Sequence, residues 1–231
     1  MKAVNTVREK LQRIPRTRYG KQTFLLSLDG KKAKVLDVGC GNNSPMRTKM
    51  LCRDCYYVGV DVGDYNQSMD SIEFADEYHV FSPDGFAEGI DALTSDYDAV
   101  ISAHNIEHCN KPEETVRAMC RRLKKGGRIH MSFPNSDSVN FPSRKGTLNF
   151  YDDPTHIYVP DMDATIRILE DEGMMIVKAI KGYKPLYYRF MGGVTEHQSK
   201  KRKQIMRGTW AYWGFESIII AEKLKSKTVQ Y

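Results

Sequence analysis

The feature that most constrains the fold is a regular alternation of short apolar segments with segments patterned like helices. Such alternation is typical of a mostly parallel β-sheet, because each parallel connection needs a crossover that covers one face of the sheet. Seven segments have the length and residue types of strands: 34–39, 56–61, 78–81, 97–102, 127–133, 174–180 and 215–221. The sequence therefore predicts an α/β fold built on a seven-stranded sheet.

Two helices of this alternation have clear ends. The segment 112–123 begins with proline, which suits the first helical position, and Lys124-Lys125-Gly126-Gly127 would give it a cationic, glycine-closed end. The segment 161–172 is the second, and Gly173 would stop it. Both are expected to pack against the sheet.

The length and composition of the chain favour a single domain. A chain of 231 residues with 41% hydrophobic and 28% charged residues can build one sizeable core. No apolar run approaches the roughly 20 residues that cross a bilayer, and the N-terminus lacks an apolar signal core, so we expect a cytoplasmic protein. The expected parts are a basic helical arm (1–30), a core (31–135) and an acceptor-side half (136–231) with an insertion at 181–214.

The five cysteines fit reduced thiols in such a compartment. Cys52 and Cys55 form one Cys-x-x-Cys pair, but no second pair completes a tetrahedral metal site. A redox role for the pair stays open, since this spacing can lower a thiol pKa. Two unrelated thiols are the simpler interpretation.

A glycine-rich turn follows the first predicted strand. Gly39 and Gly41 flank Cys40 there, and glycines let the backbone turn tightly and approach a ligand. Asp37 precedes the turn, and its carboxylate could accept hydrogen bonds from a ligand ammonium group. Asp61 ends the second strand, where an acid can take both hydroxyls of a ribose. A dinucleotide such as NAD is the rival ligand, but its fingerprint needs a third glycine and leaves Asp37 unexplained.

These segments resemble the class I S-adenosylmethionine-dependent methyltransferase family. Its first motif is similar to Leu36-Asp37-Val38-Gly39-Cys40-Gly41, and its acidic strand end to Val58-Gly59-Val60-Asp61. Further similar stretches are Ser82-Pro83-Asp84-Gly85-Phe86, Tyr97-Asp98-Ala99-Val100 through Asn105-Ile106-Glu107-His108, and Leu123-Lys124-Lys125-Gly126-Gly127-Arg128-Ile129. The resemblance is strong over residues 30–135 and looser elsewhere.

The resemblance implies a Rossmann-like three-layer sandwich whose last strand, 215–221, is antiparallel. It implies S-adenosylmethionine as cofactor, with the 82–86 loop holding the adenine and Asp84 near its amino group. The cofactor-binding residues expected on this basis are Asp37, Gly39, Cys40, Gly41, Asp61, Val62, Asp84, Gly85, Phe86 and His104. Asn42-Asn43-Ser44 departs from the family's third glycine, but asparagine tolerates positive φ, so the turn can survive.

Two histidine-containing stretches, 102–108 and 149–156, should each fall at the carboxyl ends of the strands, where ligands bind in open α/β sheets. Methyl transfer to a hydroxyl or amine requires alignment and removal of a proton, for which histidine is suited. We expect His108 or His156 to be the general base, although a structural role is open for each. His104 and His108 could also read as a metal pair, but no third ligand is evident, so no metal site is predicted. The residues expected to bind the acceptor are Asn105, Arg144, Tyr151, Asp152 and Arg189.

The acceptor itself is open. The stretch from Phe133-Pro134-Asn135 to His156 is similar to methyltransferases of cell-surface polysaccharide biosynthesis, which implies a small, anionic, phosphorylated or nucleotide-activated sugar-type acceptor. Arg144, Lys145, Lys184 and Arg189 would clamp its phosphate, with the insertion as a lid or wall.

Three alternatives remain open. The basic arm and the run at 200–203 would suit an RNA methyltransferase, although neither is interleaved with aromatic side chains as a stacking platform. The chain could be a catalytically inactive cofactor-binding scaffold. The aromatic insertion could instead be a homodimer surface.

Overall fold

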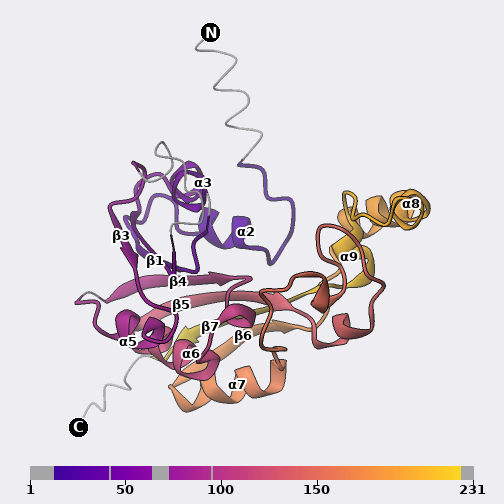
Figure 1. Cartoon of the computed structure of the whole chain (residues 1–231). Coiled ribbons are helices and arrows are strands. Elements are labelled where there is room, and N and C mark those ends of the chain that lie inside the picture. The colour runs from indigo at the N-terminus through magenta and orange to yellow at the C-terminus, as the bar shows by residue number, and fades with distance from the viewer. Residues whose placement is uncertain (1–12, 42, 64–72, 95, 225–231) are drawn as a thin grey trace.

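The computed structural model describes residues 13–41, 43–63, 73–94 and 96–224 of the chain (Figure 1). Its centre is a seven-stranded sheet in the order β3-β2-β1-β4-β5-β7-β6. The strands are β1 (Lys34–Val38), β2 (Tyr56–Asp61), β3 (Glu77–Val80), β4 (Tyr97–Ala103), β5 (Leu123–Pro134), β6 (Met174–Ile180) and β7 (Glu216–Lys223). All seven predicted strands are thus present, within a few residues of their expected ends.

The strand directions confirm the predicted topology. The strands from β3 to β5 pair in parallel, whereas β7 lies antiparallel between β5 and β6. The chain order reverses at β1, from which β2 lies on one side and β4 on the other. In an open α/β sheet a ligand crevice forms at such a switch point, outside the carboxyl ends of the strands.

Helices cover both faces of the sheet (Figure 1). One face carries α5 (Phe86–Asp91), α6 (Pro112–Arg121) and α7 (Met162–Asp171), and the other carries α2 (Lys21–Leu26) and α3 (Ser44–Leu51). Two buried apolar clusters result, one on each face. The five cysteines are buried in these layers as free thiols, and Asp161 caps α7 by accepting from the Ala164 N–H.

One boundary prediction was wrong. Lys124-Lys125-Gly126-Gly127 does not close a helix but belongs to β5, which begins at Leu123. Tyr97 of β4 donates its N–H to the Arg122 carbonyl and pairs with Leu123, so β5 begins at Leu123, four residues before the predicted start. Beyond this pair the register between β4 and β5 shifts. Gly126 takes φ +78°, which lets the strand bend at this irregularity.

The segment 181–214 is ordered as two helices that extend beyond one end of the sheet (Figure 1). They are α8 (Leu186–Arg202) and α9 (Thr209–Trp213), and short 3-10 turns occur at η1 (Ile106–His108), η2 (Ser136–Asn140) and η3 (Phe150–Asp152). A Cβ on Gly192 of α8 would lie only 2.2 Å from the Gly208 carbonyl oxygen, so the two backbones touch directly. Among the described residues, no helix is both long and apolar enough to cross a membrane.

Candidate active site

The turn between β1 and α3 has the backbone that its glycines predict. Gly39 and Gly41 have φ of +68° and +54°, and the N–H groups of Gly39 and Cys40 both donate to the Val60 carbonyl at the end of β2. A Cβ on Gly39 would strike the Asn105 side chain, whereas one on Gly41 would meet only open space. Asn43 caps α3 with φ +63°, so asparagine does tolerate the left-handed conformation here; Asn42 lies outside the described residues.

Asp61, which the sequence predicted as a ribose-binding residue, is a buried carboxylate held by two backbone N–H groups. Its carboxylate is 5% exposed and accepts from the N–H groups of Gly41 (2.7 Å) and Val62 (2.8 Å). Burial raises the pKa of Asp61 above its ordinary value, and the two N–H donors only partly oppose this effect. A carboxylate held this way at a cavity wall can accept further hydrogen bonds from hydroxyl groups.

Asp37 is engaged differently from the prediction. Its buried carboxylate already binds an ammonium group, that of Lys21, at 2.9 and 3.2 Å. The hydroxyls of Ser44 and Tyr57 donate to it at 2.6 and 3.1 Å. Asp37 therefore ties Lys21 of α2 to the first residue of α3 and to β2.

A cavity of about 480 Å³ opens at the carboxyl ends of β1, β2 and β4. Its walls bring together eight of the predicted site residues, namely Gly39, Gly41, Asp61, Val62, Phe86, His104, Asn105 and His108. They add five that the sequence did not single out for this site: Pro83, Cys109, Asn110, Thr155 and Ile157. Predicted cofactor residues outside the lining are Asp37, Cys40, Asp84 and Gly85; Asp84 accepts from the Asn110 side chain at 2.7 Å. The glycine turn, the buried carboxylate and the apolar Phe86 wall fit S-adenosylmethionine.

His104 closes the end of the cavity nearest to the insertion. It follows β4 with φ +52°, and its two ring nitrogens lie 3.2 Å from Glu107 and 3.4 Å from Glu216. Burial alone would lower the pKa of His104, but the two carboxylates outweigh it and raise the pKa to about 10. The ring also packs on Trp210 of α9 at 5.1 Å.

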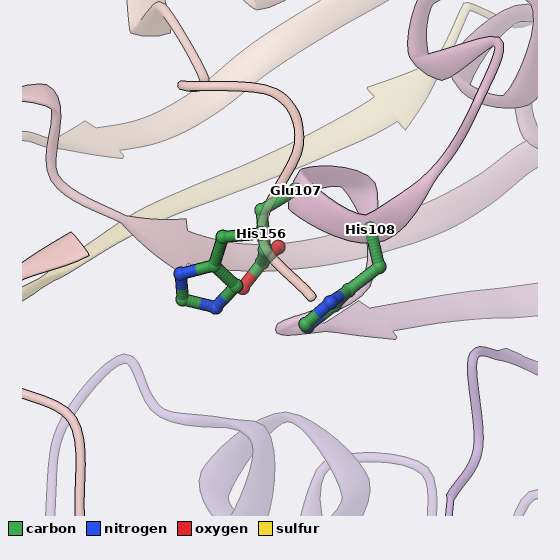
Figure 2. Close-up of side chains that lie close together, drawn as sticks. All are labelled: Glu107, His108 and His156. Carbon is green, nitrogen blue, oxygen red and sulfur yellow. The ribbon is translucent and has the colours of Figure 1, made fainter. Parts of the chain in front are cut away.

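His108 and His156 lie side by side, with ring centroids 4.8 Å apart. His108 lines the cavity, whereas the His156 side chain is only 5% exposed and lies behind it. Glu107, fully buried, lies beside both rings (Figure 2). Glu107 lies in a stretch that the sequence singled out, but its contact with His156, 49 residues away, depends on how the loop after η3 folds back and could not be predicted from local spacing.

The predicted acceptor-binding residues do not gather at one site. Arg144 is 4% exposed and its guanidinium forms two bonds with Glu196, at 2.6 and 2.9 Å, and one with Ser199. Asp152 accepts from the N–H groups of Arg144, Leu148 and Asn149 and so organises its own loop. Tyr151 is 69% exposed, and Arg189 lies on α8; neither lines the 480 Å³ cavity. These contacts favour structural roles for Arg144 and Asp152.

Known proteins share this architecture. A model of the methyltransferase domain family matches residues 7–179. Ubiquinone biosynthesis O-methyltransferases of Pseudomonas putida and Pseudomonas syringae are 30% identical over 115 residues, which cover 48% of this chain and 47% of each relative. The chain thus matches over about half the length of these curated relatives.

Solved structures agree on the fold. An S-adenosylmethionine-dependent methyltransferase from Archaeoglobus fulgidus superposes with a TM-score of 0.53 at 22% identity, covering 88% of this chain and 95% of that one. One from Mesorhizobium loti gives 0.55 at 12% identity, over 88% and 98% of the two chains. The [4+2]-cyclase SpnF gives 0.51 at 14%, over 88% and 79%.

The fold and the position of the cavity are those of the solved S-adenosylmethionine-dependent methyltransferases. The chain belongs to the methyltransferase domain family, whose model matches about three quarters of it.

Proposed function

We propose that this enzyme transfers the methyl group of S-adenosylmethionine to an oxygen atom of a small hydroxylated acceptor. The observation that carries the proposal is one cavity with the glycine turn and Asp61 on one side and His108 on the other. Oxygen as the accepting atom is supported by the names of the relatives, which are O-methyltransferases. The cofactor supplies an activated methyl group on a sulfonium when bound.

The residues of the chain would bind the cofactor and remove the proton of the acceptor. Gly39 and Gly41 let the backbone approach the cofactor, and Asp61 would hold its ribose hydroxyls. His108, which faces the cavity, and His156 behind it mark where the acceptor hydroxyl loses its proton. Alignment of donor and acceptor in this cavity supplies the larger part of the rate enhancement.

A second hollow supports an acceptor with a ring. It has a volume of about 230 Å³, and its walls include Tyr183, Tyr188, Trp210 and Glu216. Trp210 and Glu216 both contact His104, which lines the cofactor cavity, so His104 separates the two spaces. Aromatic walls with one carboxylate suit an uncharged, hydroxylated ring better than the anionic sugar-type acceptor that the sequence favoured. Arg144, the proposed phosphate clamp, is already neutralised by Glu196.

Calorimetric titration with S-adenosylhomocysteine tests the cofactor site. We expect micromolar binding, about −8 kcal/mol, that Asp61→Ala abolishes and Asp84→Ala leaves nearly unchanged, because Asp84 does not line the cavity. No binding to the parent chain would refute the proposal.

Release of S-adenosylhomocysteine in the presence of phenols, catechols or sugar phosphates then tests the acceptor class. Turnover on a phenol or catechol is expected, and turnover restricted to sugar phosphates would restore the anionic acceptor. His108→Ala and His156→Ala should each lower kcat by a factor of ~100 or more. A loss of only a few-fold in both would remove the histidines from the chemistry.

A further inference from the structure

The side chains of Glu107, His108 and His156 form a cluster at the edge of the cofactor cavity. The roles proposed so far include no function for Glu107. One ligand atom from each lies within 4.8 Å of the others. Figure 2 shows the Glu107 carboxylate between the two imidazole rings in this view. Two of the three residues come from η1, and His156 comes from the loop after η3.

Hydrogen bonds fix which nitrogen of each ring carries the proton. Nδ1 of His156 lies 2.6 Å from the Phe150 carbonyl, and Nδ1 of His108 lies 3.1 Å from the Thr155 carbonyl. The Thr155 hydroxyl, 3.0 Å from the same His108 nitrogen, donates its own proton to Asp153. Since all these partners can only accept, Nδ1 is the protonated nitrogen in both rings. The Nε2 atom of each neutral ring then carries a lone pair.

The carboxylate of Glu107 adds a third lone-pair donor. The residue is 0% exposed, and its Oε1 atom lies 3.2 Å from His104. Its Oε2 atom is buried without a hydrogen-bond partner among the described residues. A buried carboxylate oxygen left unpaired is costly, and three acceptors gathered without a donor repel one another. Asp153, whose Oδ2 lies 3.9 Å from Nε2 of His156, adds further negative charge.

We propose that Glu107, His108 and His156 bind one divalent transition-metal ion beside the methyl-transfer cavity. Two imidazoles and one carboxylate are a ligand set of catalytic zinc sites and of other open transition-metal sites. The Nδ1–carbonyl bonds are the outer contacts that usually orient metal-binding histidines. Two ligand atoms on one ion lie at most roughly 4.4 Å apart. Binding of an ion would therefore bring the three ligand atoms slightly closer together, through a small movement of the His108 ring at the cavity wall.

The ion would have a direct use in the reaction, and that use rests on the proposed function. Three protein ligands leave coordination positions open, and His108 of this cluster lines the cavity together with the neighbouring Thr155. A hydroxyl on such an ion has a lowered pKa and gives up its proton to solvent. The oxygen lone pair then forms the new O–CH₃ bond as the C–S bond breaks, and that bond's electrons convert the sulfonium to a neutral thioether. In this arrangement His108 and His156 act as ligands rather than as the base.

Cobalt and zinc titrations of the untagged, chelator-treated chain test the site. Visible absorption should show one Co²⁺ bound per chain, displaced by Zn²⁺, with a micromolar or tighter Kd. Glu107→Gln and His156→Gln should each weaken Co²⁺ binding at least tenfold, and the more accessible His108→Gln serves if a buried variant fails to fold. The matched controls are Glu114→Gln and His197→Gln, which change an exposed acid and an exposed histidine outside the cluster.

The outcomes separate this inference from the proposed function. Less than one Co²⁺ per chain, or binding that persists in His108→Gln and in the folded Glu107→Gln, would overturn the metal site. S-Adenosylhomocysteine binding is a separate measurement, because its expected contacts, Asp61 and the glycine turn, are not in the cluster. If that binding is present and Co²⁺ is not bound, the inference fails alone. If Co²⁺ binds and S-adenosylhomocysteine does not, the proposed function fails while the ion site stands.

Discussion

His130, on the interior strand β5, is a buried histidine that the fold keeps neutral. Its Nε2 atom lies 2.9 Å from the Tyr19 carbonyl, and burial lowers its pKa below 6.5. Because the folded pKa is depressed, the unfolded chain binds the proton more readily, and the stabilisation present above about pH 6.5 is lost as the pH falls. His130→Gln should flatten this part of the pH dependence, measured by urea unfolding between pH 7.5 and 5.5. His197→Gln, on the surface, should keep the parent's slope.

Lys21 is the counter-charge of the buried Asp37. Its side chain is 29% exposed and that of Asp37 is 1% exposed. Lys21→Met removes the ammonium and leaves the carboxylate with two hydroxyl donors, so we expect a loss of about 1–3 kcal/mol in the free energy of unfolding. The exposed Lys31→Met should change it by less than about 0.5 kcal/mol. If adding Asp37→Asn to Lys21→Met restores none of the loss, the charge pair is not its cause.

At this scale the sequence predicted the residues whose role depends on local backbone. Gly39 and Gly41 form the turn after β1 and Asp61 ends β2, so the position of each follows from the strand that it ends. The partners of Asp37 and Arg144 could not be predicted in the same way, because Arg144 pairs with Glu196, 52 residues away. Long-range ion pairs depend on how the elements dock, which no local spacing records.

Among the elements, α8 and the loop before α9 meet through glycine backbones. A Cβ on Gly192 would lie 2.2 Å from the Gly208 oxygen and 2.6 Å from Tyr212 Cβ, and neither backbone can retreat easily. Gly192→Ala should therefore destabilise the α8–α9 unit by about 1–3 kcal/mol, despite the better helix propensity of alanine. Fluorescence reports on this region directly, since both tryptophans of the chain lie in α9.

Gly193→Ala is the matched control one residue along the same helix. Its Cβ would meet Tyr212 at 3.6 Å, an ordinary contact, so this change should be neutral or stabilising by up to about 1 kcal/mol. Equal effects at the two positions would show that the backbone contact does not hold the unit.

The strands were predictable as elements and the insertion was not. Three parallel strands, β1, β2 and β4, are buried along most of their length and consist largely of apolar residues. α8 contains no continuous apolar run of this kind. Three of its large apolar side chains, Leu186, Phe190 and Val194, are exposed rather than packed against the sheet. The early start of β5 was missed because its lysines and glycines resemble a helix end.

For the whole molecule, cofactor binding should stabilise every layer at once. The cavity is built from loops after β1, β2, β3 and β4, so its ligand binds only the assembled sheet. At a concentration 100 times Kd, S-adenosylhomocysteine should add about 2.7 kcal/mol to the free energy of unfolding. Calorimetric melting should show this as a rise in Tm that Asp61→Ala abolishes. A ligand-dependent shift of the same size in Asp61→Ala would show that the ligand binds elsewhere.

The contacts of residues 19–21 should form in a definite order while the chain is being synthesised. Lys21 and Asp37 are 16 residues apart and can meet as soon as β1 emerges. Tyr19, however, must wait 111 residues for His130 and 164 residues for the hydroxyl of Tyr183, to which its N–H donates. The segment around Tyr19 is thus synthesised before every strand of the sheet, yet its last contacts form only when β5 and the segment after β6 have been made.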